Sequence, residues 1–220
     1  MKNLRIDTAK VPDILRNNAF KEIRIFALGP EGTNISQAAY KWAEEEKILN
    51  KSKIILCDTP EQEIELSMQM KEKGVLPIFA LCAVYYDLCK VFFRHLENYT
   101  FLHHYYMQLD HMQLASKKYN VDTLKKNATV AAHVSPSVLL EGTEYLFIKA
   151  NSNSAAAKMC ALGEVDACIT TQRACEIYNL KTIKEYGAPN MLFTFGTTNY
   201  GAEQIYNVIN SQTEDVNGIA

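Results

Sequence analysis

The sequence lacks the features that mark several large classes of protein. Its 220 residues carry a net charge of −2, and its 23 Lys and Arg residues are scattered, which disfavours a nucleic-acid partner. The longest apolar run, Val75–Tyr86, is too short to span a bilayer, and the first ten residues contain no apolar signal-peptide core. We therefore expect a cytoplasmic protein that binds neither nucleic acid nor membranes.

The cysteines and histidines lack the spacing typical of metal sites. Six cysteines are present without any C-x-x-C pair, and most of them lie inside apolar runs. The adjacent His103 and His104 point to different sides of a helix or strand, so they are poorly placed to chelate one ion together. We expect buried free thiols, no metal site and no cofactor.

What the chain does have is a 48% hydrophobic content and a repeated strand-helix pattern. The expected strands lie at 23–28, 53–57, 75–81, 128–133, 144–149, 165–170 and 181–185. The expected helices lie at 36–47, 60–73, 136–142, 154–162 and 171–179. This alternation predicts an α/β fold with parallel strands covered by helices. Residues 85–126 show no clear period.

Two strand-helix sets separated by this irregular stretch predict two lobes with a cleft between them. The apolar run Met191–Gly196 is expected to return to the first lobe. The predicted parts are an N-terminal helical extension at 1–21, lobe 1 at 22–106 and 189–205, lobe 2 at 107–188, and a flexible tail at 206–220.

Strand-to-helix turns supply the candidate binding residues. A glycine-rich turn ahead of a helix N-terminus presents backbone N–H groups to an anion, and the expected ligand-binding residues there are Glu31, Gly32, Thr33 and Asn34. Similar turns in the second set contribute Ser135, Ser152, Asn153 and Ser154. The alternative at each place is an ordinary turn or helix cap.

Several of these segments resemble a known family when they are taken in order. "LGPEGT", "AHVSPSVLL", "ANSNSAAAKMCALGEVDACITTQRACEIYNL" and a closing apolar strand are similar to successive blocks of the prephenate dehydratase catalytic domain, over about residues 23–196. The resemblance implies two α/β lobes, like those of type II periplasmic binding proteins, with prephenate held between them.

Departures from the dehydratase pattern indicate a particular branch. The family's Thr-Arg-Phe motif falls near Leu192-Phe193-Thr194, where neither its Thr nor its Arg stands at the matching place, and its Glu-Asn-Ser motif falls at Phe79-Ala80-Leu81. The residues after Gly196 leave no room for the regulatory ACT domain. With Tyr86-Asp87-Leu88-Cys89-Lys90, these features resemble the short prephenate decarboxylase of bacilysin (anticapsin) biosynthesis.

That resemblance implies a lyase that decarboxylates prephenate without aromatising its ring, feeding the synthesis of a non-proteinogenic amino acid. His133 is the leading candidate for the acid that protonates ring carbon, followed by Asp87 with Tyr86, while Leu192 and Phe193 are expected to line the substrate pocket. A structural role for His133 stays open, as does a homodimer. The alternatives are a dehydratase without regulation and a non-catalytic protein that binds a small dicarboxylate.

Overall fold

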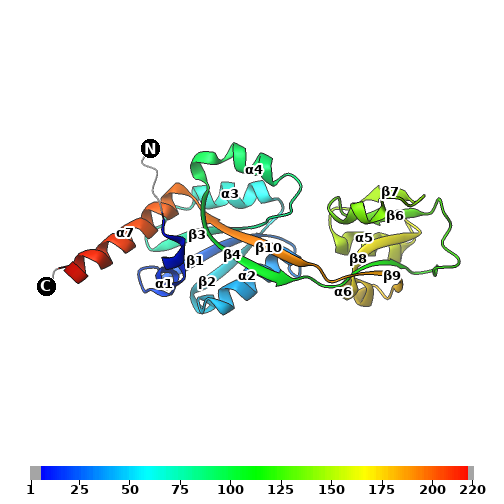
Figure 1. The fold of residues 1–220 in the computed structure, drawn as a ribbon, viewed down its shortest axis with the longest axis horizontal. Helices are drawn as coiled ribbons and strands as arrows, with labels where there is room; N and C mark the ends of the chain where they lie inside the picture. The colour runs from blue at the N-terminus through cyan, green and yellow to red at the C-terminus, as the bar shows by residue number, and fades with distance from the viewer. Residues whose placement is uncertain (1–5, 218–220) are drawn as a thin grey trace. The chain divides into compact units, whose positions relative to one another are not determined.

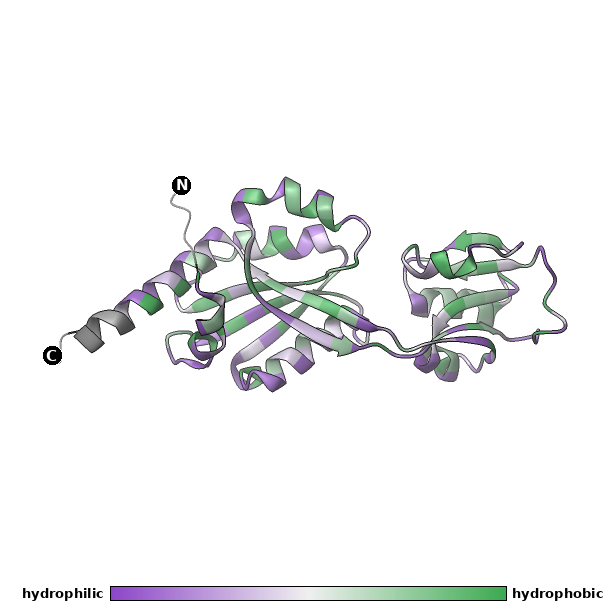
Figure 2. Cartoon of the chain, viewed as in Figure 1, coloured by the Kyte–Doolittle hydropathy of each residue, from purple (hydrophilic) through white to green (hydrophobic). Residues whose placement is uncertain are grey.

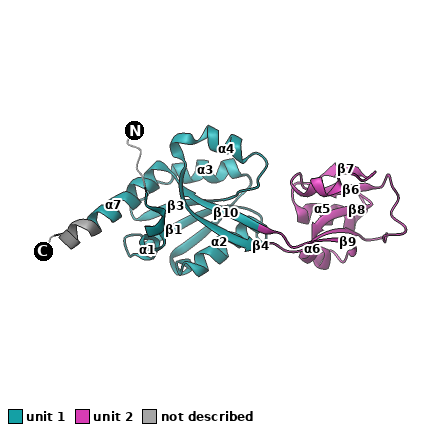
Figure 3. Cartoon of the chain, in the orientation of Figure 1, with its two compact units in different colours: residues 1–107, 191–220 teal, residues 108–190 magenta. Residues whose placement is uncertain are grey.

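The chain forms two compact units, shown in a computed structural model that describes residues 6–217 (Figure 3). Unit 1 comprises residues 1–107 and 191–220, and unit 2 comprises residues 108–190. Unit 1 is therefore made from two separate pieces of chain. Residues 1–5 and 218–220, which belong to the predicted extension and tail, lie outside the described residues.

Unit 1 is built on a five-stranded sheet of order β2-β1-β3-β10-β4 (Figure 1). Its strands are β1 (Glu22–Leu28), β2 (Ser52–Cys57), β3 (Val75–Cys82), β4 (Thr100–Gln108) and β10 (Asn190–Thr197). β1 pairs in parallel with β2 and β3, whereas β10 is antiparallel to β3. The strands expected from the strand-helix repeat, β1, β2 and β3, are thus parallel as predicted. The returning strand β10 runs the other way, and a local apolar pattern carries no information about strand direction.

Helices cover both faces of this sheet, with α2 on one side and α3 and α4 on the other (Figure 1). The helical segments of unit 1 are η1 (Thr8–Lys10), α1 (Val11–Arg16), α2 (Asn34–Glu45), η2 (Leu49–Lys51), α3 (Pro60–Gln69), α4 (Leu88–Arg94), η3 (Leu96–Asn98) and α7 (Asn199–Asn217). The central strand β3 is buried from Val75 to Leu81, as expected for a strand covered on both faces. On the α2 side, the ring of Trp42 stacks on Phe195 at a centroid distance of 3.8 Å.

Two helix ends in unit 1 differ from expectation. α3 ends at Gln69 rather than at 73, because the chain must turn through Gly74, with φ at +78°, to enter β3. The predicted tail at 206–220 is helical as far as Asn217. This helix is anchored near its start, where Ala202 and Ile205 are buried against the unit 1 core.

Unit 2 contains the second five-stranded sheet, of order β7-β6-β8-β5-β9. Its strands are β5 (Met112–Ser116), β6 (Thr129–Ala132), β7 (Leu146–Lys149), β8 (Ala167–Thr171) and β9 (Lys181–Gly187). β6 is parallel to β7 and β8, but β5 is antiparallel to both β8 and β9. This sheet is mixed, but the strands predicted from the sequence, β6, β7, β8 and β9, run in the same direction. β5, which lies in the stretch without a clear period, is antiparallel to its neighbours.

The helical segments of unit 2 are η4 (Pro136–Leu140), α5 (Asn153–Leu162) and α6 (Gln172–Ile177). η4 is a 3₁₀ helix, where an α-helix over 136–142 was expected. Figure 2 shows that hydrophobic residues follow the strands of both sheets. All six cysteines are free thiols, as predicted, although Cys89 is exposed. Within residues 6–217, no helix combines the length and apolar character needed to cross a membrane.

Candidate functional site

In unit 1 the candidate site is the turn between β1 and α2. The hydroxyl of Thr33 donates to the carbonyl oxygen of Leu28 at 2.6 Å and accepts from the amide of Ser36 at 3.3 Å. Thr33 is therefore the N-cap of α2, and its side chain is already engaged within the protein. The structure thus shows the helix cap that the sequence analysis gave as the alternative to ligand binding.

Backbone groups of the same turn remain for a ligand. The amides of Asn34 and Ile35 occupy the first turn of α2, where an N–H has no partner within the helix. Gly32 is exposed and adopts a φ of +87°, and a Cβ built on it would meet nothing within 4 Å. The exposed Glu31 carries a negative charge beside these donors. The turn thus offers hydrogen-bond donors without a neighbouring cation of its own.

In unit 2 the candidate site begins at the N-terminus of α5. The hydroxyl of Ser152 accepts from the amide of Ala155 at 3.0 Å and caps this helix. The next residue, Asn153, has a buried side-chain oxygen that lacks a hydrogen-bond partner among the described residues. Ser154 is exposed. Ser152 is thus a cap, whereas Asn153 and Ser154 retain polar atoms that a ligand can use.

His133 follows β6 at the same end of the unit 2 sheet. Its Nδ1 accepts from the amide of Ser135 at 3.3 Å, so the proton of the neutral imidazole lies on Nε2. Burial lowers the pKa of His133, and the positive charge of Lys149 lowers it further. His133 is therefore mainly neutral at neutral pH.

Lys149 is a residue that the sequence reasoning missed. It is the last residue of β7 and pairs in register with Ala132, directly before His133. Its charge stands at the carboxyl ends of parallel strands, where ligands of α/β sheets commonly bind. The available signal was a lysine closing an apolar run just ahead of the capping Ser152. Unit 2 therefore combines a cation, an imidazole and a helix N-terminus, which together favour an anion.

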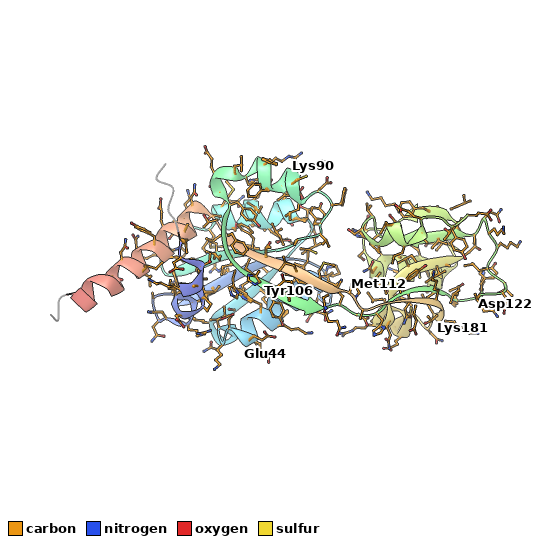
Figure 4. The ribbon with its side chains drawn as sticks, viewed as in Figure 1. Glu44, Lys90, Tyr106, Met112, Asp122 and Lys181 are labelled. Atoms are coloured by element: carbon orange, nitrogen blue, oxygen red, sulfur yellow. The ribbon has the colours of Figure 1, made fainter. Side chains whose placement is uncertain are left out.

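Tyr86 and Asp87, the second candidates for the acid, lie in unit 1. Asp87 forms an ion pair at 2.6 Å with Lys90, which Figure 4 labels on α4, and this bond lowers the pKa of the Asp87 carboxyl. A hydrogen bond to Asp87 raises the pKa of the Tyr86 hydroxyl. Asp87 is thus ionised and Tyr86 holds its proton firmly, so neither group is a ready acid at neutral pH.

Leu192 and Phe193, the two residues of β10 that were expected to line the substrate pocket, differ in their exposure. Phe193 is fully buried opposite Cys82 of β3, so it presents no surface to a ligand in this structure. Leu192 is half-buried, and its carbonyl oxygen accepts from the amide of Ala83 at 2.9 Å. The segment Phe79–Leu81 is also fully buried. Of the positions that resemble the family's motifs, Phe79–Leu81 and Phe193 therefore lie in the core, whereas Leu192 and Thr194 are half-buried.

Glu63 on α3 is a second residue that sequence reasoning missed. Its side chain is completely buried, and neither carboxyl oxygen makes a hydrogen bond of good geometry among the described residues, although backbone groups of Leu28 and Ala80 lie close enough to lower its pKa in part. Burial raises the pKa of this carboxyl well above its usual value. No local signal distinguishes Glu63, since it is one of three glutamates within residues 61–65. A neutral carboxylic acid thus lies inside unit 1.

Metal ligation was not expected from the sequence. In the part of the chain that the structure describes, no group of three or more His, Cys, Asp or Glu side chains is placed to hold a metal ion.

Solved structures share this two-sheet α/β fold. The VFT2 domain of BvgS from Bordetella pertussis, as a double mutant, aligns with a TM-score of 0.54 and 18% identity over 92% of this chain and 90% of that one. The periplasmic VFT2 domain of BvgS without those mutations gives 0.54 and 17% over 91% and 92%. These likenesses concern the fold alone.

A prephenate dehydratase from Staphylococcus aureus aligns at 12% identity with a TM-score of 0.45, over 79% of this chain and 66% of its own length. No curated protein sequence matches this chain. The model of the prephenate dehydratase family, however, matches residues 25–188, which is about three quarters of the chain. The match spans the β1 turn, His133 and the α5 N-terminus. The chain therefore belongs to the prephenate dehydratase family.

Proposed function

We propose that this protein is a lyase that decarboxylates prephenate and leaves the ring non-aromatic. Family membership supports a lyase acting on prephenate. The finer proposal depends on one observation: the positions that resemble the dehydratase Thr-Arg pair are Leu192 and Phe193, and Phe193 is buried in the core. A dehydratase must assist the departing ring hydroxyl with an acid or a cation, and these two side chains offer neither.

The substrate carries two carboxylates, and each unit offers one set of donors. In unit 1 the donors are the first-turn amides of α2, and in unit 2 they are those of α5 together with Lys149. Lys149 is the stronger of the candidate carboxylate partners, because it adds a full charge to the helix N-terminus. The exposed hydroxyl of Ser154 supplements it as a donor.

In the proposed reaction the bond between the quaternary ring carbon and its carboxylate breaks, and carbon dioxide leaves. The electron pair that remains spreads through the ring alkene and takes up a proton at carbon, while the ring hydroxyl stays. His133 is the candidate donor of that proton, through Nε2. In the acid form Nδ1 also carries a proton, so the hydrogen bond that it accepts from the Ser135 amide in the neutral ring must break first. Since burial lowers the pKa of His133, its protonated fraction, and with it the rate, should increase as the pH falls below neutrality.

The product would be a dihydro-hydroxyphenylpyruvate. Its keto acid group is a substrate for transamination, so we propose that it leads to a non-proteinogenic amino acid of the kind used in antibiotic synthesis. The dehydratase reading has equal support from the family match, and a non-catalytic dicarboxylate-binding protein is the third candidate.

A product assay separates the three candidates. Purified protein and prephenate should release one carbon dioxide per substrate and yield a keto acid without the absorbance of phenylpyruvate. Stoichiometric phenylpyruvate would replace the proposal with the dehydratase, although that reaction also releases carbon dioxide. Saturable binding without turnover would identify a binding protein.

A further inference from the structure

The outer edge of β7 in unit 2 is an exposed apolar strand edge. β7 stands at one end of the strand order of its sheet, so this edge pairs with no strand among the described residues (Figure 1). All four residues of β7 are exposed, and three in succession are apolar: Leu146, Phe147 and Ile148 are 54%, 45% and 36% exposed. Since successive side chains of a strand point to opposite faces, apolar surface is open on both faces of the sheet here.

The connections on either side of β7 explain this exposure. The chain reaches β7 from β6 through η4, a 3₁₀ segment of only five residues, and leaves it towards the ten-residue helix α5. Leu140 of η4 packs in one apolar cluster with Ala132 on β6 and Ile169 on β8. Helices on both faces normally cover the parallel strands of such a sheet, and this short segment covers the inner strands instead. β7 is thus left open.

The opposite edge of the same sheet is protected against the addition of another strand. β9 carries the exposed charged residues Lys181, Lys184 and Glu185, and its pairing with β5 contains two register shifts. Charged side chains and bulges are the usual means by which proteins keep an edge from pairing with another chain. The pairing of β7 with β6 is regular, and the only charged residue of β7 is its last. Of these two edges, β7 is the one suited to strand addition.

The hydrogen bonds of β7 determine which residues can pair outwards. The amides of Leu146 and Ala150 donate to carbonyl oxygens on the β6 side, at 2.9 and 2.8 Å. Backbone groups alternate in direction along a strand, so the N–H and C=O groups of Tyr145, Phe147 and Lys149 point towards the outer edge. A partner strand must therefore form its hydrogen bonds with residues 145, 147 and 149.

We propose that this edge binds a second copy of the chain, with the two β7 strands antiparallel about a two-fold axis at Phe147. Such an axis, normal to the sheet, pairs residue 147 with itself, residue 146 with 148 and residue 145 with 149. The outward groups of each strand then meet those of the other, and Leu146 lies opposite Ile148 on one face. The strand edge is thus complementary to itself. This inference is independent of the proposed reaction.

The charges at the two ends of β7 also favour antiparallel pairing of two copies. Glu144 precedes the strand, and Lys149 ends it. Antiparallel pairing brings the acidic end of one strand to the basic end of the other, whereas parallel pairing would set like charges side by side. Glu144 also pairs with Lys126 at 3.1 Å, but both side chains are exposed, and an exposed pair of this kind is weak.

Sedimentation of the full chain over a range of concentrations tests the proposal. We expect reversible dimerisation, from the chain mass of 24.9 kDa to twice that value, with a dissociation constant in the micromolar range because the strand edge is short. Amide exchange followed by NMR reports the register. The Phe147 and Lys149 amides should become protected only as the dimer forms, whereas the Leu146 amide should be protected throughout. A chain that stays monomeric, or a dimer in which the Phe147 amide stays unprotected, would overturn the proposal.

Charged variants at the two-fold axis test the pairing itself. Phe147→Glu and Phe147→Lys should each dimerise at least roughly tenfold more weakly than the parent, because residue 147 faces its own copy and like charges then meet. An equal mixture of the two variants should recover dimer, since unlike charges then face each other. Ile177→Glu, which changes another exposed apolar residue of unit 2, is the matched control and should dimerise as the parent does.

Thermal midpoints of all three variants should stay close to that of the parent, because both side chains are exposed. Undiminished dimerisation by Phe147→Glu would show that the copies meet elsewhere and would overturn the proposal. A mixture that stays monomeric would contradict pairing of residue 147 with itself.

Discussion

At the scale of single residues, the orientation of His133 limits what its ring can do. The backbone amide of Ser135 donates to Nδ1 of the neutral ring, so the ring proton lies on Nε2, and protonation of Nδ1 to form the acid breaks this bond. Burial favours the neutral ring and lowers its pKa, and this limits the fraction of molecules in which His133 is an acid.

Replacing His133 tests this role directly. His133→Gln should lower kcat by about 10²–10⁴, the usual effect of losing a general acid, with a smaller change in KM. The variant should also lose the rise in rate that we expect for the parent as the pH falls below about 6.5. Rates and thermal midpoints should be measured on the same preparations, with the exposed His111→Gln as the matched control. A normal rate per folded molecule would assign His133 a structural role.

The buried carboxyl of Glu63 should make the stability of the fold depend on pH. Its pKa is raised in the folded protein, so below about pH 4.3 the carboxyl is protonated in both folded and unfolded chains. Above that pH the unfolded chain loses the proton while the folded one retains it, so this residue destabilises the fold increasingly as the pH rises towards its folded pKa.

Glu63→Leu should therefore raise the free energy of unfolding at pH 7, by on the order of 1–3 kcal/mol, because an unpartnered buried polar group is removed. The gain should shrink towards pH 4. Urea unfolding at several pH values measures it, and Glu65→Leu controls for the change in helix composition. A gain that does not depend on pH would contradict the assignment of a neutral buried acid.

At the scale of elements, the β1–α2 turn combines a backbone requirement with a candidate binding surface. Gly32 adopts a φ of +87°, and Gly142 in unit 2 a φ of +75°, with open space beside each. A side chain in this conformation costs roughly 1–2 kcal/mol at either position. Substitutions at the two glycines should therefore cause similar backbone strain, and only the one at Gly32 should also affect ligand contact.

Gly32→Ala and Gly142→Ala should both lower stability by about 1–2 kcal/mol. Only Gly32→Ala should weaken prephenate binding, by roughly tenfold or more, because its methyl group obstructs hydrogen bonds to a charged ligand. Equilibrium binding and thermal unfolding of both variants give the comparison. If both variants bind prephenate equally well, the turn only connects β1 to α2 and does not contact the ligand.

At the scale of the whole molecule, the two units differ in how many segments of chain they need to complete their sheets. Unit 2 is one continuous segment that contains all five strands of its sheet. Unit 1 needs β10, which returns after unit 2 and lies between β3 and β4. Phe193 and Phe195 on this strand are fully buried.

A chain that ends at residue 190 should therefore keep a cooperatively folded unit 2 and lose the native packing of unit 1. Hydrogen exchange followed by mass spectrometry should show protected amides in β6 and β8, with loss of protection in β1 and β3. The full-length chain is the control, and native protection of β1 in the shortened chain would show that unit 1 does not require β10.

Local features of this protein were readable from its sequence. Strand β1, the turn at Gly32 and the cap at Ser152 follow from residues close together in the chain, because glycine conformation and capping act within one turn. The order of motifs was also sufficient to suggest the family that the family model identifies.

Tertiary structure decided the features that depend on distant partners. The antiparallel direction of β5 and β10 is set by pairing with strands far along the chain, and no local period encodes it. The isolation of Glu63 likewise depends on strands and helices from several segments, which remove its carboxyl from water without supplying a counter-charge. Lys149 is placed beside His133 only because β7 pairs in register with β6. The sequence by itself determined the local elements, whereas the fold determined the charges around the candidate sites, because electrostatic interactions depend on distance in space.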